Sequence, residues 1–191
     1  MNFIKARSLK ARLFQRFCDK LGAEQSNLLF YCNARWLSKG KVLLRVYELR
    51  NEIFIFLNEE NHALAITFEN KVFLTQLAYL CDIFAKLNQL NISLQGKDTH
   101  VLQLHDKTTA FKRKLHLWKT DLLINNEQCD SFPLLKSRIN SQSGNLSLQN
   151  TDECDMKTVM CSHLDALLKS TSVSVCFRGI SRLHSAFIFL R

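Results

Sequence analysis

Apolar residues recur at alternating steps of three and four along three long stretches of this chain, and this spacing constrains its fold more than any other feature. The single proline and all five glycines fall at or outside the ends of the periodic stretches. Such a pattern places one row of apolar side chains along one side of an α-helix, where the row faces a partner. The three rows are Val42, Val46, Leu49, Ile53 and Phe56; Phe73, Leu77, Leu80, Phe84, Leu87, Asn91 and Leu94; and Val101, Leu104, Thr108, Phe111, Leu115, Trp118 and Leu122.

These rows predict three helices. The first follows Ser38 and ends before the polar residues 58–61, the second covers about 69 to 94, and the third covers about 100 to 124. Short connections between consecutive helices favour antiparallel neighbours. The expected fold is therefore mainly α, an antiparallel bundle of three long helices.

A short helix and a strand are expected before the bundle. Ser8 can cap a helix from about 9 to 21, and Gly22 is placed to end it. The apolar run 28–32 is typical of a buried strand. A lone strand leaves its backbone groups unpaired unless another segment supplies a partner, so a poorly folding fragment stays among the alternatives.

The C-terminal third has a different composition. Residues 125–155 are rich in Asn, Ser and Gln and contain Pro133 and Gly144, which predicts a flexible linker. Residues 156–170 offer a short helix, and residues 172–177 alternate like a strand. We therefore expect residues 156–191 to form a short helix and a divergent tail.

Positive charge is concentrated at the N-terminal end. Residues 1–50 hold eleven Lys/Arg and three acidic residues, a balance of +8 out of the +9 of the whole chain. On the predicted helix 9–21, Arg12, Arg16 and Lys20 recur every four residues and form one row. This row lies beside the expected apolar side of the helix, which consists of Leu13, Phe14, Phe17 and Leu21. Such a row either is a solvated surface or attracts the phosphates of nucleic acid.

The remaining composition bounds the compartment and the chemistry. Seven cysteines without a Cys-x-x-Cys pair argue against a disulfide framework and against a zinc module of that type. No apolar run is long enough to span a membrane, so we expect a nuclear or cytoplasmic protein with reduced thiols. We expect no cofactor, metal site, membrane partner or small-molecule substrate, and Cys161 and His163 are interpreted as ordinary helix residues.

Five segments in order carry a resemblance to a known family. The most informative is the run 31–50 with its Arg35-Trp36 pair, and the others are residues 2–8, 77–84, 87–96 and 110–118. Together they resemble the hAT superfamily of DNA transposases, and most closely its domesticated vertebrate members with BED zinc fingers or general-transcription-factor II-I repeats. The resemblance covers residues 2 to about 135.

The resemblance implies a remnant of an RNase H-like transposase fold with its helical insertion. Residues 1–36 would be the end of the RNase H-like region, residues 37–124 the helical insertion, 125–155 the linker and 156–191 the tail. Transposase chemistry needs three carboxylates that hold two divalent metals. The family places them outside this stretch, and Asp82 belongs to the insertion pattern, so we expect no enzymatic activity.

The family also suggests which residues meet DNA. It places the Arg35-Trp36 pair beside the active site, where the arginine can meet a phosphate, but Trp36 can equally anchor the turn in the core. The predicted DNA-binding residues are Arg12, Arg16, Lys20, Arg35, Trp36, Lys39 and Lys41. The function favoured by the sequence is an inactive, transposase-derived nuclear protein with non-specific DNA association. The alternatives are a helical protein-protein interaction module, with a partner or as a homo-oligomer, and a degenerate fragment without independent function.

Overall fold

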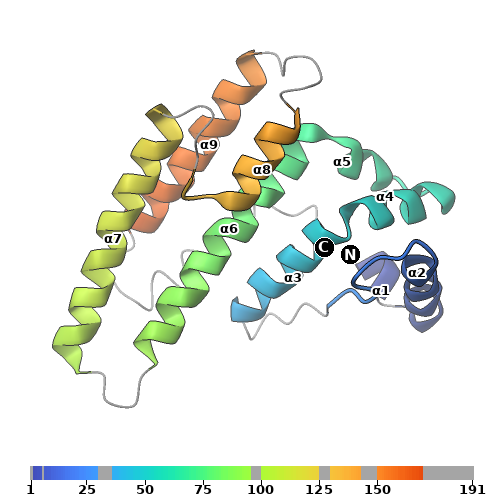
Figure 1. Ribbon diagram of the computed structural model, residues 1–191, viewed down its shortest axis with the longest axis horizontal. Coiled ribbons are helices and arrows are strands. Elements are labelled where there is room, and N and C mark those ends of the chain that lie inside the picture. Colours follow the sequence, from blue (N-terminus) through green and yellow to red (C-terminus); the bar gives the residue numbers. More distant parts are fainter. Residues whose placement is uncertain are drawn as a thin grey trace. The chain divides into compact units, whose positions relative to one another are not determined.

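The computed structural model describes residues 2–5, 7–29, 36–95, 100–124, 130–142 and 150–169. Within these ranges every regular element is a helix, which confirms the mainly α class (Figure 1). The chain divides into two compact units, one built on the residues up to Cys81 and one on the residues from Asp82 onward. Helix α6 runs through the boundary.

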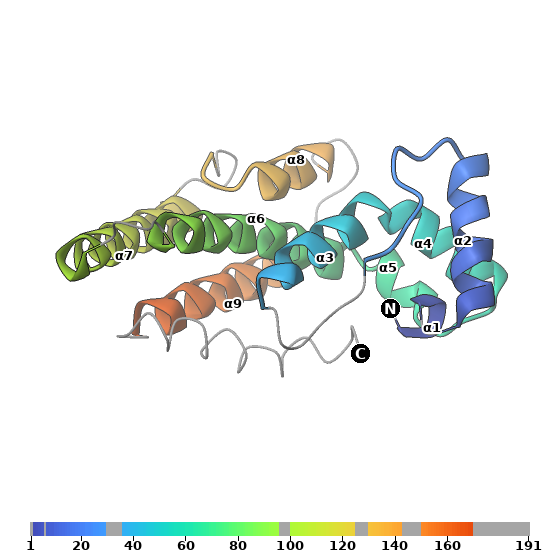
Figure 2. The same cartoon turned by 90° about the horizontal axis from the view of Figure 1, so that it is seen from below.

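The first unit contains five helices in the described ranges and the beginning of a sixth. They are α1 (Asn2–Lys5), α2 (Ser8–Lys20), α3 (Trp36–Glu48), α4 (Arg50–Glu59), α5 (Ala65–Glu69) and the start of α6 (Lys71–Leu94). Helix α2 packs against α4, where Phe14 and Phe17 meet the ring of Phe56 edge-on at 5.3 and 5.9 Å (Figure 2). These edge-to-face contacts bury Phe14 and fix which side of α2 faces the core.

Gly22 ends α2 as the sequence predicts. Its φ of +69° is a left-handed conformation in which a side chain is strained. The N–H of Gly22 donates to the carbonyl of Asp19 (3.2 Å), and the N–H of Ala23 donates to that of Cys18 (3.1 Å). This pair of bonds is a Schellman motif. The start differs from the prediction, because Arg7 occupies the cap position, no side chain caps the helix, and Ser8 is its first helical residue.

The predicted strand is not found in the described residues. Leu28 and Leu29 carry no β-structure, and residues 30–32 lie outside the described ranges. Leu28 is nevertheless buried, and the carbonyl of Asn27 accepts a hydrogen bond from Arg45 Nη1 at 2.9 Å. The apolar run therefore correctly indicates that Leu28 is buried, but a short segment can be buried without forming a strand.

The first predicted long helix is divided at Leu49 into α3 and α4. All five residues of its apolar row are buried, so the predicted core side is correct. At the division, Arg50 Nη1 donates to the carbonyl of Tyr47 at 2.8 Å and its guanidinium lies 4.6 Å from the Tyr47 ring. A side chain that bonds a backbone carbonyl competes with the helical ladder, which explains the bend there.

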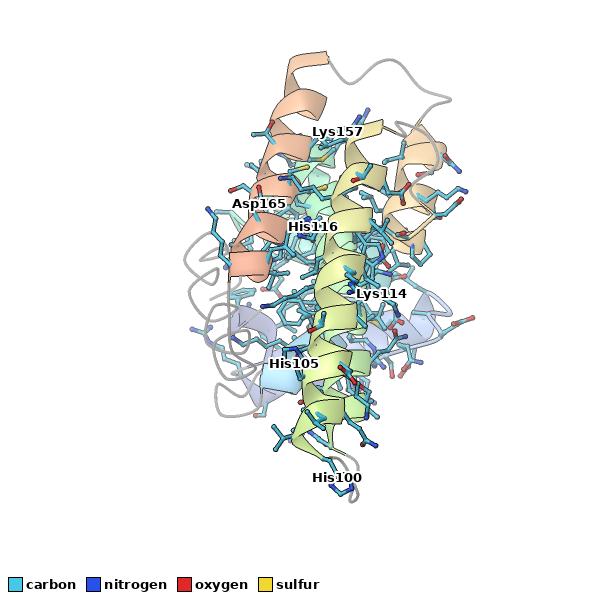
Figure 3. All side chains as sticks on the ribbon, turned by 90° about the vertical axis from the view of Figure 1, so that its left-hand side faces the viewer. His100, His105, Lys114, His116, Lys157 and Asp165 are labelled. Atoms are coloured by element: carbon cyan, nitrogen blue, oxygen red, sulfur yellow. The ribbon has the colours of Figure 1, made fainter. Side chains whose placement is uncertain are left out.

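In the second unit, α7 (Val101–Ile124) and α9 (Asn150–Lys169) pack side by side and run in opposite directions (Figures 1 and 3). Lys119 Nζ joins them through both carboxylate oxygens of Asp165, at 2.7 and 2.8 Å. The predicted antiparallel bundle of three long helices is not confirmed, because the first of them is divided into α3 and α4 and α7 packs against α9. Periodicity shows that a helix has an apolar side but does not identify the element that covers it.

Helix α8 (Pro133–Gln142) lies within the stretch expected to be a linker, and α9 begins at Asn150 instead of Met156. The side chains of Phe132 and Leu135 are almost fully buried. These two apolar side chains anchor the short helix, and proline is well tolerated at the first helical position. Residues 172–177, the second expected strand, lie outside the described ranges.

Asp82 on α6, although remote in the sequence, caps the start of α8. Its carboxylate accepts the backbone N–H groups of Leu134 (3.3 Å) and Leu135 (3.0 Å), the second and third residues of α8. These are donors that a helix leaves unpaired at its start. Desolvation raises the pKa of Asp82, and the two hydrogen bonds and nearby Lys86 oppose that rise. The acid that the resemblance assigned to the helical insertion therefore has a structural task.

Phe111 and Trp118, two aromatic residues of the third apolar row, are buried to different extents. Phe111 is buried, and its ring meets Trp118 edge-on at 5.5 Å, while Trp118 is half-buried and meets Phe132 at 6.2 Å. Lys86 Nζ lies 4.5 Å from the centroid of the Trp118 ring, and desolvation lowers the pKa of Lys86. The row fails at its first member, because Val101 is 80% exposed.

Candidate nucleic-acid interface

Helix α2 has two contrasting sides. Phe14 and Cys18 are buried against the unit, and Arg12, Arg16 and Lys20 are all exposed. Steps of four residues on an α-helix keep side chains on nearly one line, so the three cations form one row. We call these three residues the α2 basic row.

The α2 basic row has no carboxylate partner in the described part of the chain. Lys10, on another side of the same helix, provides the contrast: its Nζ pairs with the Glu60 carboxylate and lies 3.8 Å from the centroid of the Phe3 ring. Lys10 is therefore used in holding α2 to the unit. The cations of the row are left to interact with solvent or with an anionic partner.

Two leucines share the exposed side with the α2 basic row. Leu9 is 67% exposed and Leu13 is 42% exposed, and Leu21, at the end of the helix, is 51% exposed. The sequence interpretation placed Leu13 and Leu21 on the core side with Phe14 and Phe17, and the structure corrects this. Only some of the apolar side chains of α2 therefore pack into the core of the unit, and the others remain exposed.

The other predicted contacts fare differently. Arg35 lies outside the described residues, and Trp36 is the first residue of α3, with a side chain that is also outside them. Lys41 is exposed on α3, but Lys39 is only 9% exposed. A lysine with so little exposed surface has to move its side chain outward before it can meet a DNA phosphate, so the interface proposed below rests on the α2 basic row.

Cys18, on the buried side of α2, has an unreactive thiol. Burial, with the charges of Glu52 and Asp19, raises the pKa of Cys18 to about 11, so its thiol stays protonated at neutral pH. A protonated, fully buried thiol is a poor nucleophile. Across the described residues, no group of three or more His, Cys, Asp or Glu side chains could hold a metal ion, and no helix could cross a membrane.

The sequence analysis interpreted His163 on α9 as an ordinary helix residue and gave it no electrostatic role. Burial lowers its pKa to about 4, so its imidazole is neutral at physiological pH. Cys161, two residues earlier, is also buried, and desolvation raises its pKa. The useful signal was the position of His163 on the same helix as the buried Leu164 and Leu167, which predicts a histidine near the core.

Comparisons with known proteins agree with this helical architecture. Residues 1–123 match the family described as the FAM200/GTF2IRD2 helical domain. A general transcription factor II-I repeat domain-containing protein 2 from Bos taurus is 37% identical over 147 residues, which cover 77% of this chain and 15% of the relative. The chain thus spans about 15% of the length of that relative. No solved structure matches the chain.

Proposed function

The chain belongs to the FAM200/GTF2IRD2 helical-domain family, and we propose that it is a catalytically inactive, transposase-derived nuclear module that associates with DNA without reading its sequence. The name of the bovine relative contains a transcription factor, which supports a nuclear location. We further propose that the domain descends from the helical insertion of an RNase H-like hAT transposase. The five ordered segments of the sequence support that origin.

The observation that carries the proposal is the α2 basic row, exposed and free of carboxylate partners among the described residues. The row extends about 12 Å, since a helix rises about 1.5 Å per residue. One strand of B-DNA carries about three to four phosphates over that length. Three cations at this spacing can release counterions from one stretch of backbone, and this interaction needs no contact with the bases.

The proposal includes no catalysis, and three carboxylates of the described residues have structural uses. Asp82 caps α8, Asp165 binds Lys119, and Glu60 binds Lys10. Two-metal catalysis requires carboxylates that converge on one site with free oxygens. These three groups are instead engaged in holding helices together.

Fluorescence anisotropy of the whole chain with a short random duplex across a salt series tests the proposal. We expect micromolar binding at low salt and, for three phosphate contacts, a slope of about −2.7 in the logarithm of affinity against that of salt. The variant Arg12→Glu, Arg16→Glu, Lys20→Glu should lose binding, because it presents three anions to the phosphates.

A matched triple variant separates the α2 basic row from net charge. Arg113, Lys114 and Lys169 are exposed in the second unit, and their change to Glu alters the total charge equally. We expect this control to retain most of the affinity. Equal losses in both variants, or no binding by the unchanged chain at low salt, would contradict a specific role of α2.

A second candidate function, a helical protein-protein interaction module, is favoured by Leu9 and Leu13. Large apolar side chains exposed on one side of a helix fit the groove of a protein partner or a second copy. Sedimentation of the chain at low and high salt tests this function. A discrete oligomer that is insensitive to salt would favour it over DNA association, and a non-cooperative thermal transition would favour a degenerate fragment.

A further inference from the structure

Ser8 stands at the head of the α2 basic row. Ser8, Arg12, Arg16 and Lys20 follow one another at steps of four residues, so the serine lies one turn before the first cation of the row. It is exposed and is the first residue of α2. Its neighbour Arg7 takes the cap position, and no side-chain hydrogen bond caps this helix.

Cations flank Ser8 on both sides in the sequence. Arg7 comes directly before it, Lys10 and Arg12 follow two and four residues later, and Lys5 lies three residues before it. Arg7 and Arg12 are exposed, and Lys10 is engaged with Glu60. Protein kinases select substrates partly by charge pattern, and an acidic substrate cleft would select a serine surrounded in this way.

We propose that Ser8 is a phosphorylation site for a basophilic serine kinase and that its phosphate switches off the DNA association of the α2 basic row. The second half rests on the proposed function. In the reaction, Ser8 Oγ attacks the γ-phosphorus of ATP, an O–P bond forms, and the bond from that phosphorus to the leaving oxygen of ADP breaks. The hydroxyl proton passes to a base of the kinase.

The start of α2 can be presented to such an enzyme. Arg7 has an extended backbone, with φ −110° and ψ 113°, so the chain already leaves helical geometry just before Ser8. The N–H of Ala11 bonds the carbonyl of Arg7 at 3.0 Å, and this bond of the first turn must open. Helix ends open at little cost, while Phe14 keeps the later turns in place.

The phosphate acts on the row by direct charge pairing. A phosphoserine carries a charge of about −1.5 to −2 at neutral pH, and four residues along a helix it reaches Arg12. The positive end of the helix dipole favours a phosphate at this position, so the modification does not unwind α2. Two of the three positive charges of the row are then neutralised, and one effective phosphate contact is left.

The test uses the whole chain with phosphoserine incorporated at position 8. Phosphoserine at Ser162, which is exposed on α9, is the matched control for the added charge. Binding to a random duplex is followed by anisotropy between about 50 and 200 mM salt. At low salt we expect the phosphorylated Ser8 chain to bind about tenfold more weakly than the Ser162 control, with the salt slope reduced from about −2.7 to about −1.

A second arm examines the modification independently of DNA. The unmodified chain is incubated with ATP, Mg²⁺ and a basophilic serine kinase, and mass spectrometry locates the phosphate. We expect modification at Ser8, abolished in Ser8→Ala and reduced about tenfold in Arg7→Glu. Arg7 lies outside the α2 basic row, so this substitution separates kinase selection from DNA binding.

The outcomes distinguish the two proposals. Equal DNA affinities of the two phosphorylated chains, with the unmodified chain binding well, would overturn the switch and leave the proposed function standing. Failure of the unmodified chain to bind DNA would overturn both the function and the switch, and the kinase arm alone would then decide the site. No phosphate at Ser8 would overturn the site itself.

Discussion

Helix α2 in the first unit and helix α7 in the second both carry several cations, yet these cations have different surroundings. On α7, Lys119 binds Asp165 of α9, and Lys107 Nζ donates to the carbonyl of Ser93 at 2.6 Å. On α2, Arg12, Arg16 and Lys20 are exposed and no carboxylate of the described residues pairs with them. Lys107 and Lys119 of α7 thus join helices, whereas the three cations of the α2 basic row are presented to solvent.

The same contrast extends to groups that are not on the surface. In the second unit, Asp82 caps α8, Lys86 lies over Trp118, and His163 is half-buried and neutral at physiological pH. Charged and titratable groups there are part of the architecture, so changing them should change stability. Changing the α2 basic row should change binding and leave the fold intact. The predictions below test that division.

Acidification should have the largest effect, and it should act through His163. Its folded pKa of about 4 lies below the ordinary value of 6.5, so the unfolded chain binds the proton more tightly. The stability that neutral His163 provides is complete above pH 6.5 and is lost as the pH falls towards 4, by about 2 to 3 kcal/mol. Urea unfolding at pH 7 and at pH 4.5, followed by signals of the second unit, measures this loss.

Substitution identifies the group responsible. His163→Gln should reduce the difference between the two pH values, while His116→Gln, at an exposed position of α7 (Figure 3), should leave the difference unchanged. An unchanged pH dependence in His163→Gln would show that other groups dominate acid unfolding.

The next effect is that of Asp82→Ala. It removes the acceptor for the N–H groups of Leu134 and Leu135, and uncapped helix donors that lack a partner cost about 1 to 3 kcal/mol. Urea unfolding should show this loss, and hydrogen exchange should show faster exchange in α8. Asp106→Ala, at an exposed site on α7, is the control and should have little effect.

A second substitution separates the effect of the charge of Asp82 from the effect of its hydrogen-bond acceptor. Because desolvation raises its pKa, protonation of this carboxyl favours the folded state as the pH falls, opposite in sign to His163. Asp82→Asn keeps one acceptor oxygen and removes the buried charge, so it should cost less than Asp82→Ala. A larger loss in the Asn variant would contradict the capping role.

The sequence revealed the local features of this fold better than its long-range ones. The rows of apolar residues located the helices, and Gly22 located an end, because periodicity and left-handed turns are local properties. The division at Leu49 and the cap on α8 depend on Arg50 and Asp82, whose bonds are visible only in three dimensions. An amide-rich composition also hid α8, since Phe132 and Leu135 are too few to produce a periodic signal.

The candidate site was predictable to the same extent. Spacing alone placed Arg12, Arg16 and Lys20 on one line of a helix, and the structure has all three exposed. The burial of Lys39 could not be anticipated, because lysine is normally exposed and its burial depends on the neighbouring chain. Whether these cations bind DNA stays a prediction.

The smallest expected effect is on stability, and it concerns the α2 basic row itself. Arg12→Ala, Arg16→Ala, Lys20→Ala should leave the free energy of unfolding within about 0.5 kcal/mol of the unchanged chain, or raise it by a few tenths. Two reasons favour the rise: alanine is a better helix former, and like charges four residues apart repel one another. Urea unfolding, with Arg113, Lys114 and Lys169 changed to Ala as the control, measures it.

A loss above about 1 kcal/mol would mean that the row supports the fold and would remove the contrast between the two units. A gain in stability together with a loss of DNA affinity would mean that the three cations repel one another in α2. The repulsion would then be tolerated because the row binds a polyanion.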